Sequence, residues 1–408
     1  MQKSTTTKIH KGLAEGIVLC VYYTFSENLK ADKVIEQILR SNKKWGSRDR
    51  AFIAENAYEI IRWWRLLHHL NDTPSLPHEP YIIWHLLEIW LTLKGHDIPT
   101  WEEFKQIKAH VLKTKLSQIQ QHRAIRESIP DWLDERAAAE IGEDLWEKEI
   151  KAMNKLAPVY LRVNTNKSNR DAVQAALKIA GIHAKTIQGQ PQTLMLTERK
   201  NVFSTDIFKA GHFEVQDLGS QMIATFLDPK PGQRIIDACA GAGGKTLHIA
   251  NLMENKGRII AMDIYDFKLK ELNKRAKRND IHNIETRLIA GKVIKRLHHT
   301  ADKVLLDVPC SGTGVLKRNP DAKWKLSPEY IDELIQMQKK ILWDYSKMVK
   351  VGGELVYATC SLLASENQNQ VTGFLEEHPN FQMVSEQRIS PATLQSDGFY
   401  MAKMTRVE

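Results

Sequence analysis

A short stretch with one acid and three glycines constrains the fold of this chain most strongly. Residues 234–246 read RIIDACAGAGGKT, so that a short apolar run ends at Asp237 and a glycine-rich turn follows. The next residues, 247–252, carry apolar side chains at helical spacing. Strand, glycine turn and helix begin a nucleotide-binding α/β unit. Glycines let the backbone approach a ligand, and the start of the helix presents free N–H groups to it.

Two kinds of nucleotide loop compete for this turn. The phosphate-binding P-loop, G-x-x-x-x-G-K-[ST], matches at Gly244–Thr246 but requires a glycine where this chain has Cys239. A dinucleotide- or S-adenosylmethionine-type loop instead requires an acid at the end of the next strand, to hold ribose hydroxyls. Residues 258–262 read as that strand and Asp263 ends it. The sequence therefore favours the second kind of loop.

Composition points to a reducing compartment and an acidic partner. The 408 residues give room for two or three domains, and no run approaches the roughly twenty apolar residues of a membrane span. The N-terminus is polar and lacks the apolar core of a secretory signal. Four cysteines without CxxC spacing predict neither a disulfide framework nor a zinc site, so we expect no metal and a cytoplasmic protein. A net charge of +9 favours nucleic acid, although a merely basic soluble protein has the same composition.

The N-terminal part of the chain has a helical pattern. Ser47 is a plausible N-cap for a long helix that carries apolar residues from Phe52 to Leu67, and residues 81–93 read as a buried helix that stops at Gly95. Eight of the ten tryptophans precede residue 150, which indicates a separate aromatic core. We therefore expect an all-α domain over residues 1–150. Its arginines fit a nucleic-acid surface and a solvated helix face equally well: Arg48, Arg50, Arg62 and Arg65.

The rest of the chain predicts two further domains. Residues 151–229 read as a small α+β module with strands at 159–163, 194–196 and 211–216 and a helix at 170–179. Over 230–408 strands alternate with helices, which predicts a parallel, doubly wound sheet with its ligands beyond the carboxyl ends of the strands. The predicted strands of this sheet are 235–237, 259–263, 286–289, 304–307 and 355–359.

Two cysteines fall just past the ends of two predicted strands. Cys310 lies in VLLDVPCSGTG, residues 304–314, and Cys360 lies in LVYATCS, residues 355–361. A single buried cysteine usually acts as a small hydrophobe. Two cysteines on the ligand edge of the sheet, beside Asp237 and Asp263, are instead expected to share a pocket.

A thiol beside a methyl donor suits one reaction in particular. The C5 atom of a pyrimidine is a poor nucleophile, but a thiolate added at C6 makes C5 enolate-like, so that C5 can attack a sulfonium methyl group. The C5 proton then leaves and the thiolate is eliminated. A free thiol is little ionised at pH 7, so neighbouring positive charge or a base would help. Asp307 is placed to stabilise the adduct by hydrogen bonding near N3 of cytosine.

These motifs resemble those of the Nop/Sun family of RNA cytosine-C5 methyltransferases. The family carries a DACAAPGGKT-like loop, a DxPCSGxG loop and a Y-[AS]-T-C-S loop, which correspond here to residues 237–246, 307–314 and 357–361. Residues 366–367 and 397–400 resemble its closing segments, and 161–164 and 215–221 its pre-catalytic module. Over its whole length the chain resembles the methyltransferase B group, which acts on bacterial small-subunit ribosomal RNA, and residues 31–55 resemble the NusB-like RNA-binding domain of that group.

The resemblance implies a fold, a cofactor and a role for each site residue. The C-terminal domain would be a Rossmann-like class I methyltransferase domain that binds S-adenosyl-L-methionine. Cys360 would be the nucleophile, Cys310 would assist removal of the C5 proton and release of the enzyme, and Asp307 would hold the base near Lys245. The cofactor would contact Ala238, Cys239, Ala240, Gly241, Ala242, Gly243, Gly244, Lys245, Asp263 and Asp307. Arg318, Arg162 and Asn164 would contact the RNA, which is 16S ribosomal RNA by preference and transfer RNA as the alternative. We expect a monomer.

The chain departs from the family pattern at two places on the cofactor side. Gly241-Ala242 replaces the usual Ala-Pro, and Ala290 stands where an acid beside the adenine is usual. A non-catalytic RNA-binding or ribosome-assembly factor that keeps the fold is therefore the alternative from another class. The helix after Asp263 also carries a basic run, which is usually a solvated face but here is expected to track phosphates: Lys268, Lys270, Lys274, Arg275, Lys277 and Arg278.

Overall fold

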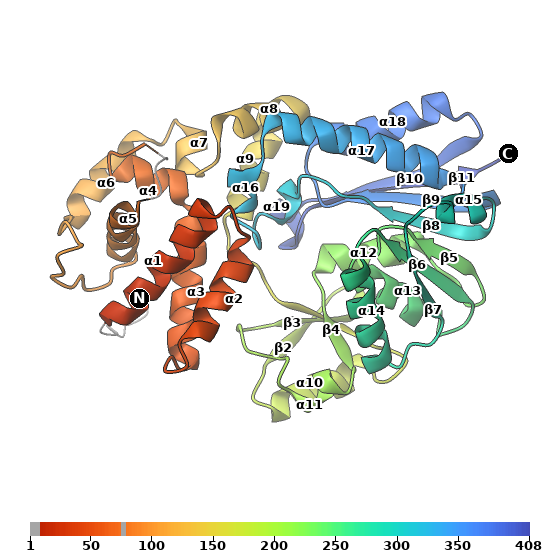
Figure 1. The fold of residues 1–408 in the computed structure, drawn as a ribbon, viewed down its shortest axis with the longest axis horizontal. Coiled ribbons are helices and arrows are strands. Elements are labelled where there is room, and N and C mark those ends of the chain that lie inside the picture. The colour runs from red at the N-terminus through yellow and green to blue at the C-terminus, as the bar shows by residue number, and fades with distance from the viewer. Residues whose placement is uncertain (1–8, 75–78) are drawn as a thin grey trace. The chain divides into compact units, whose positions relative to one another are not determined.

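The computed structural model describes residues 9–74 and 79–408, which divide into two compact units. The first unit comprises the described part of Met1–Asn154 together with Leu316–Pro328, and the second comprises Lys155–Val315 and Glu329–Glu408. In the described residues the first unit is helical, and the second holds the strands (Figure 1). The predicted multidomain fold, with an N-terminal all-α region, a small α+β module and a C-terminal α/β region, is confirmed.

The first unit is built around the helix predicted at 81–93. This helix, α5, is apolar on most sides and buried along most of its length, as expected for a central helix. The helices around it contribute to one core that contains Ile17, Ile60 and Trp64. The helices of this unit are α1 Lys11–Ser26, α2 Ala31–Ser41, α3 Ser47–Arg62, α4 Trp64–Leu70, α5 Pro80–Leu93, α6 Ala109–Gln118, α7 Arg123–Arg126, α8 Asp131–Ile141, α9 Glu143–Met153 and α16 Ala322–Lys325.

The long helix predicted from Ser47 differs from the structure at both ends. Ser47 is the first residue of α3, and Gly46 is its N-cap, with the Gly46 N–H donating to the Asp49 carboxylate at 2.9 Å. An acid in the first turn also suits the positive end of the helix dipole. The helix then breaks at Trp63, so that Leu67 lies on the separate helix α4.

Three of the four arginines that fitted a nucleic-acid surface are used inside the first unit. Arg62 is buried and donates to the carbonyls of Met153 and Lys317, at 3.1 and 3.0 Å. Arg50 donates to the carbonyl of Trp45 and Arg65 to that of Ile129. These guanidinium groups therefore provide donors for backbone carbonyl groups that would otherwise be unpaired. Of the four arginines only Arg48 is exposed.

The segment Leu316–Pro328 also belongs to the first unit. The Trp324 indole N–H donates to the carbonyl of Ile61 at 2.7 Å, and Lys323 Nζ donates to that of Arg62 at 2.9 Å. Both acceptors lie in the last turn of α3, where carbonyl groups lack partners within the helix. The segment thus caps α3 and anchors itself to the unit.

A four-stranded antiparallel sheet forms the small module of the second unit. Its order is β2-β3-β1-β4, and the predicted strands and helix are confirmed with β2 as an addition. The elements are β1 Tyr160–Val163, α10 Arg170–Ile179, β2 Ala184–Ile187, β3 Gln190–Leu196, α11 Asp206–Lys209 and β4 Phe213–Val215.

A seven-stranded sheet forms the larger part of the second unit. Its order is β10-β11-β9-β8-β5-β6-β7, and the strands from β9 to β7 in that order run parallel, as predicted. The expectation of an entirely parallel sheet is wrong, because β11 pairs antiparallel with both β9 and β10. The strands are β5 Arg234–Asp237, β6 Arg258–Asp263, β7 Ile284–Leu288, β8 Ala301–Asp307, β9 Val349–Thr359, β10 Phe381–Ile389 and β11 Phe399–Arg406.

Helices cover both faces of this sheet (Figure 1). On one face α12, α13 and α14 pack against side chains such as Ile235 and Val356. On the other face α17 and α18 pack against side chains such as Ile236 and Tyr357. No helix in the described part of the chain combines the length and the apolar character that a membrane crossing needs. The helices are α12 Leu218–Leu227, α13 Gly244–Leu252, α14 Asp266–Arg278, α15 Val293–Arg296, α17 Pro328–Ser346, α18 Gln368–Glu377 and α19 Pro391–Leu394, with 3-10 turns Thr313–Val315 and Ala364–Glu366.

Candidate active site

The glycine turn connects β5 to α13 and leaves an open face for a ligand. Gly241 and Gly243 have positive φ angles of +55° and +86°, which favour glycine, and a Cβ at Gly241 would meet nothing within 4 Å. The Asp263 carboxylate supports the turn, since its Oδ2 accepts the Gly241 N–H at 2.9 Å. Its Oδ1 accepts the Tyr265 N–H at 2.9 Å, and further lone pairs stay available for ribose hydroxyls. The open glycine face and this carboxylate fit a nucleoside cofactor.

Asp237 lies in the buried floor of this turn, and the partly exposed Cys239 follows it. Asp237 is 1% exposed and accepts the Thr246 hydroxyl at 2.7 Å. Burial raises the pKa of Asp237 to about 6, against the opposing effect of that hydrogen bond. Burial, with the neighbouring Asp237, likewise raises the pKa of the Cys239 thiol well above its usual range. Cys239 is therefore a neutral thiol that contributes packing to the turn.

Lys245 and Asp307 form an ion pair between the glycine turn and the end of β8. Lys245 Nζ lies 2.5 Å from Asp307 Oδ2. Burial opposes the charge on Lys245, but the attraction of Asp307 outweighs it, and the pKa of Lys245 is raised above its usual value with a smaller contribution from Cys360. The ammonium group of Lys245 thus stays protonated and supplies positive charge to the cysteine site.

The two cysteines meet at the ends of β8 and β9. The Sγ atoms of Cys310 and Cys360 lie 3.3 Å apart, within hydrogen-bonding distance. The hydrogen bond with Cys360, together with burial, raises the pKa of Cys310 well above its usual range. The two thiols are thus in direct contact, as expected for two cysteines that share a pocket.

Gly314 locks the two cysteine loops together. Its N–H donates to the Cys360 carbonyl at 2.9 Å, and its own carbonyl accepts the Gly398 N–H at 2.7 Å. A Cβ at Gly314 would come within 2.3 Å of the Gly398 carbonyl oxygen. Only glycine fits here without moving one of the backbones, which explains a glycine at this position of the loop.

The fully buried carboxylate of Glu366 accepts hydrogen bonds from both cysteine loops. It accepts the backbone N–H of Ser311 at 2.8 Å and the hydroxyls of Ser311 and Ser361, each at 2.5 Å. Gln338 of α17 adds an N–H···O bond at 2.9 Å and donates equally to the Pro309 carbonyl. Each serine follows one of the cysteines in the chain, so Glu366 fixes the separation of the two sulfurs. The sequence marked 366–367 only as a motif, because a buried brace has no signal of its own in a single sequence.

Comparisons with known proteins identify the family of this chain. A model described as "16S rRNA methyltransferase RsmB/F" matches residues 224–405, and one described as "Methyltr_RsmF/B-like, ferredoxin-like domain" matches 129–203. "Ribosomal RNA small subunit methyltransferase B" of Vibrio vulnificus is 34% identical over 295 residues, which cover 70% of this chain and 68% of that protein. The chain belongs to the RsmB/F family. It is thus an S-adenosylmethionine-dependent RNA methyltransferase, as the sequence predicted.

Further relatives of the RsmB/F family agree. The "Probable ribosomal RNA small subunit methyltransferase B" of Synechocystis is 33% identical over 68% of this chain and 67% of its own length, so the matched part spans about two thirds of these relatives. Among solved structures, PH0851 has a TM-score of 0.83 at 25% identity and covers 98% of this chain and 100% of its own. A methyltransferase homologue from Pyrococcus horikoshii has a TM-score of 0.62 at 27% identity, over 70% and 97%.

Two of the three residues predicted to contact RNA, Arg162 and Asn164, lie in the interior of the second unit of this RsmB/F chain. Arg162 is 1% exposed, and burial lowers its pKa to about 9. Asn164 is also buried and donates to the carbonyls of Gly211 and Asn279 at 2.9 and 2.8 Å. Both side chains are enclosed in the second unit, and this burial argues against direct contact of either one with RNA. Arg318 lies on the Leu316–Pro328 segment of the first unit, and its contact with RNA stays a prediction.

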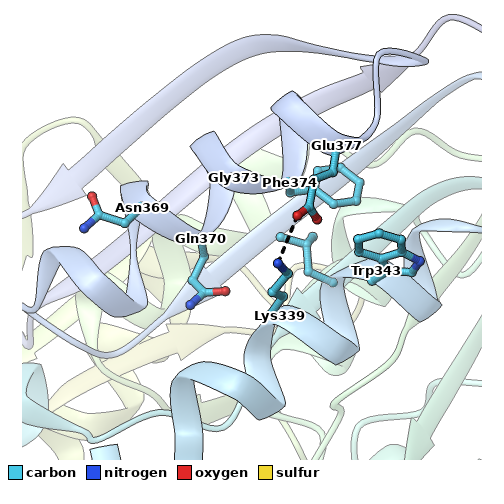
Figure 2. Close-up of a pocket in the computed structure, with 8 residues that line it drawn as sticks. Lys339, Trp343, Asn369, Gln370, Gly373, Phe374 and Glu377 are labelled. Carbon is cyan, nitrogen blue, oxygen red and sulfur yellow. Dashed lines mark hydrogen bonds and ion pairs between the residues drawn. The ribbon is translucent and has the colours of Figure 1, made fainter. Parts of the chain in front are cut away.

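A separate hollow lies between α17 and α18 and contains none of the site residues named for the RsmB/F motifs. Its volume is about 140 Å³, and an ion pair at 3.0 Å between Lys339 and Glu377 crosses it (Figure 2). Trp343 and Phe374 form its apolar wall. The hollow is thus a feature of the helical layer and has no part in the site at the strand ends.

Proposed function

We propose that this chain methylates C5 of a cytosine in 16S ribosomal RNA, with Cys360 as the nucleophile. The observation that carries the proposal is the pair of cysteine sulfurs 3.3 Å apart beside the Lys245–Asp307 ion pair. A single thiol at a strand end would fit a packing role. Two thiols in contact, next to a partly exposed ammonium and a carboxylate, fit a reaction in which a sulfur adds to the substrate and later leaves.

The first step is addition of the Cys360 sulfur to C6 of the cytosine. The raised pKa of Cys310 keeps that thiol neutral, and the ammonium of Lys245 would favour negative charge on a sulfur beside it. A new bond forms between Sγ and C6, the electron pair of the C5–C6 double bond forms a C4–C5 double bond, and the pair of the C4–N3 double bond moves onto N3. Asp307, held by Lys245, is placed to keep the base in register by hydrogen bonds on its N3 side.

The residues of the glycine turn would hold the cofactor. Residues 238–244 offer the open backbone face and Asp263 offers lone pairs for the ribose, while Lys245 and Asp307 close the site toward the base. When bound there, S-adenosylmethionine supplies the methyl group that C5 takes up. The chain's own contribution is to hold C5 and exclude competing nucleophiles.

The last step releases the enzyme. The C5 proton passes to a solvent water molecule, the C5–H electron pair forms the C5–C6 double bond again, and the bond between Cys360 Sγ and C6 breaks with its electron pair returning to sulfur. Cys310 stays within hydrogen-bonding distance of the departing sulfur and stabilises the thiolate that forms. The resemblance further assigns to Cys310 assistance in removing the C5 proton.

Ribosomal RNA is the substrate that the family name and the charge of the surface support. The exposed residues Lys270, Lys274 and Lys277 on α14 are suited to phosphates, whereas Arg275 and Arg278 of the predicted basic run turn inward to Glu214. We assign the helical, pre-catalytic and catalytic domains to residues 1–150, 151–229 and 230–408. We further infer a monomer that works in the cytoplasm, where ribosomal RNA is the partner.

Bisulfite sequencing of total RNA from cells with and without the gene tests this function. The expected result is the loss of one protected cytosine in 16S ribosomal RNA, restored by the wild-type gene and not by a Cys360→Ala copy. A loss in transfer RNA would keep the chemistry and overturn the substrate. No change at any cytosine would contradict the proposal and favour an RNA-binding assembly factor.

A further inference from the structure

The antiparallel sheet of the second unit has no residue in the cysteine site, yet one of its strands presents a buried acid to the catalytic part. Glu214 on β4 is 3% exposed. Its carboxylate accepts from Arg275 at 3.0 Å and from Asn279 at 2.5 Å, and Arg278 also donates to it. All three donors lie on α14 or directly after it. Burial opposes the charge on Glu214, but Arg275 and Arg278 outweigh it and hold the pKa of Glu214 below its usual value.

The contact between β4 and α14 is close and made by backbone as well as side chains. Gly211, just before β4, has a φ of +74°, and a Cβ there would come within 2.1 Å of the Arg278 carbonyl oxygen. Asn164 donates to the carbonyls of Gly211 and Asn279, which ties the two segments at the same point. A shift of the small sheet would therefore be transmitted to the C-terminal half of α14.

The same helix supports the glycine turn from behind. Arg275 donates to the Ala242 carbonyl at 2.7 Å, with the nitrogen that Glu214 does not use. Leu272 lies against Gly243, where a Cβ would come within 2.5 Å of the leucine Cγ. Arg275 is thus the one described side chain that bonds to both Glu214 and the glycine turn. Its planar guanidinium group presents two donors at a fixed angle, which suits such a bridge better than a lysine would.

We infer that Arg275 is a positioning residue for cofactor binding, and that Glu214 of the small sheet orients it. Arg275 holds the Ala242 carbonyl, and the N–H of the next residue, Gly243, donates to the Ala240 carbonyl at 2.9 Å, so that the turn keeps one backbone conformation for the cofactor. Glu214 fixes the rotamer of Arg275 and desolvates it. The small sheet therefore sets the affinity of the glycine turn for S-adenosylmethionine while touching neither the cofactor nor the cysteines.

A purely structural role predicts a different outcome. If the Glu214 cluster only holds the two sheets together, weakening it lowers stability and affects binding of cofactor and RNA alike. If Arg275 positions the turn, its loss weakens cofactor binding selectively. Two measurements distinguish these roles. The first is the dissociation constant for the cofactor, and the second is whether a variant changes the KM for S-adenosylmethionine while leaving kcat unchanged.

The experiment is isothermal titration of S-adenosylmethionine into the full-length chain and three variants. Arg275→Met keeps Glu214 paired with Arg278 and Asn279, so the fold is expected to survive, but removes the bond to Ala242. We expect its Kd to rise about 10- to 100-fold, the effect of losing one hydrogen bond from a charged donor. Arg275→Lys should fall between Arg275→Met and wild type. Arg278→Lys is the matched control, since Arg278 binds the same carboxylate without reaching the turn, and its Kd should stay within about twofold of wild type.

Activity and thermal unfolding complete the test. With saturating cofactor, kcat of Arg275→Met should approach that of wild type, while its KM for S-adenosylmethionine rises with Kd and its KM for RNA stays unchanged. A wild-type Kd for Arg275→Met would overturn the inference, as would an equal loss in Arg278→Lys. Because the titration needs no RNA, failure of the cytosine assignment would appear only in the RNA assays and leave this test readable.

Discussion

The two cysteine loops and the glycine turn, which together build the site, are supported in opposite ways. The cysteine loops are braced from inside by Glu366, whose carboxylate receives four donors in a fully buried position. The glycine turn has an open ligand face. On its other side Leu272 packs against Gly243, and Arg275 donates to the Ala242 carbonyl. The two cysteine sulfurs thus have a fixed geometry, whereas the residues that face the cofactor are less constrained and can vary in sequence. The departures from the family pattern, Gly241-Ala242 and Ala290, both fall on the cofactor side.

The largest effect is expected from Cys360→Ala. The variant lacks the sulfur that adds to C6, so methyl transfer to 16S transcript should fall to background, while the Kd for S-adenosylmethionine stays near that of wild type. Transfer of tritiated methyl groups measures the first quantity and titration the second. Turnover by this variant would contradict the assignment of the nucleophile.

Glu366→Gln should damage the cysteine loops and spare the glycine turn. The amide keeps the shape of the side chain but offers one acceptor where two serine hydroxyls and a backbone N–H need partners. We expect kcat to fall about 100-fold through displacement of the sulfurs. The free energy of unfolding should fall by roughly 1–3 kcal/mol through unpaired buried donors.

Steady-state kinetics and urea denaturation measure these two effects. Glu377→Gln is the matched control, because Glu377 forms only a surface ion pair with Lys339, and its stability should change by less than about 0.5 kcal/mol. Equal kcat values for Glu366→Gln and wild type would contradict the claim that Glu366 fixes the geometry of the cysteine loops.

Asp237→Asn tests the buried floor of the glycine turn through pH. The pKa of Asp237 is about 6 in the folded chain, above the unfolded value of about 3.9, so the folded state binds its proton more tightly. The charged carboxylate therefore destabilises the fold at pH above about 6, and this penalty disappears as the pH falls below about 4.

The neutral amide avoids that penalty and still accepts the Thr246 hydroxyl. We expect the variant to be more stable than wild type by about 1–3 kcal/mol at pH 7.5, with the gain reduced by about half at pH 5. Urea denaturation at the two pH values measures the difference. A gain that does not depend on pH would show that Asp237 is not the titrating group.

The smallest effect is expected from restoring an acid at Ala290. Ala290 is exposed after β7, at the cofactor edge of the sheet. Ala290→Asp would add an acceptor for the adenine amino group, and we expect the Kd for S-adenosylmethionine to fall about three- to tenfold. Ala290→Asn is the control for added size. Unchanged affinity in the Asp variant would indicate that the usual contact is supplied elsewhere in this chain.

The sequence predicted the parts of the molecule that depend on local pattern. The strand, glycine turn and helix around Asp237 and the two cysteine loops were recognisable because each is continuous in the chain and each loop follows an apolar strand. The parallel strands β5 to β8 followed from alternation with helices. The antiparallel β10 and β11 did not, because β10 carries largely exposed residues and joins the sheet only by pairing with β11.

Side-chain roles that depend on distant partners could not be predicted. Arg275 and Lys274 are neighbours in one basic run, yet Arg275 turns inward because it binds Glu214. That partner lies more than sixty positions away in the chain, so the run itself does not reveal it. Glu366 accepts hydrogen bonds from serines of two separate loops, and Arg162 and Asn164 are buried where the motif alone suggested RNA contacts. In each case a tertiary contact determines whether the side chain is bonded inside the protein or available to a ligand.

The proposed mechanism depends most directly on the division of labour between the two cysteines, and one experiment measures it. Cys310→Ala is incubated with S-adenosylmethionine and a labelled, unmethylated 16S transcript, and the products are separated under denaturing conditions. Addition and methylation survive in this variant while release fails, so a covalent RNA–protein band should accumulate and should be absent from the double variant Cys310→Ala/Cys360→Ala. A band that persists in the double variant, or normal turnover without a band in Cys310→Ala, would contradict the account.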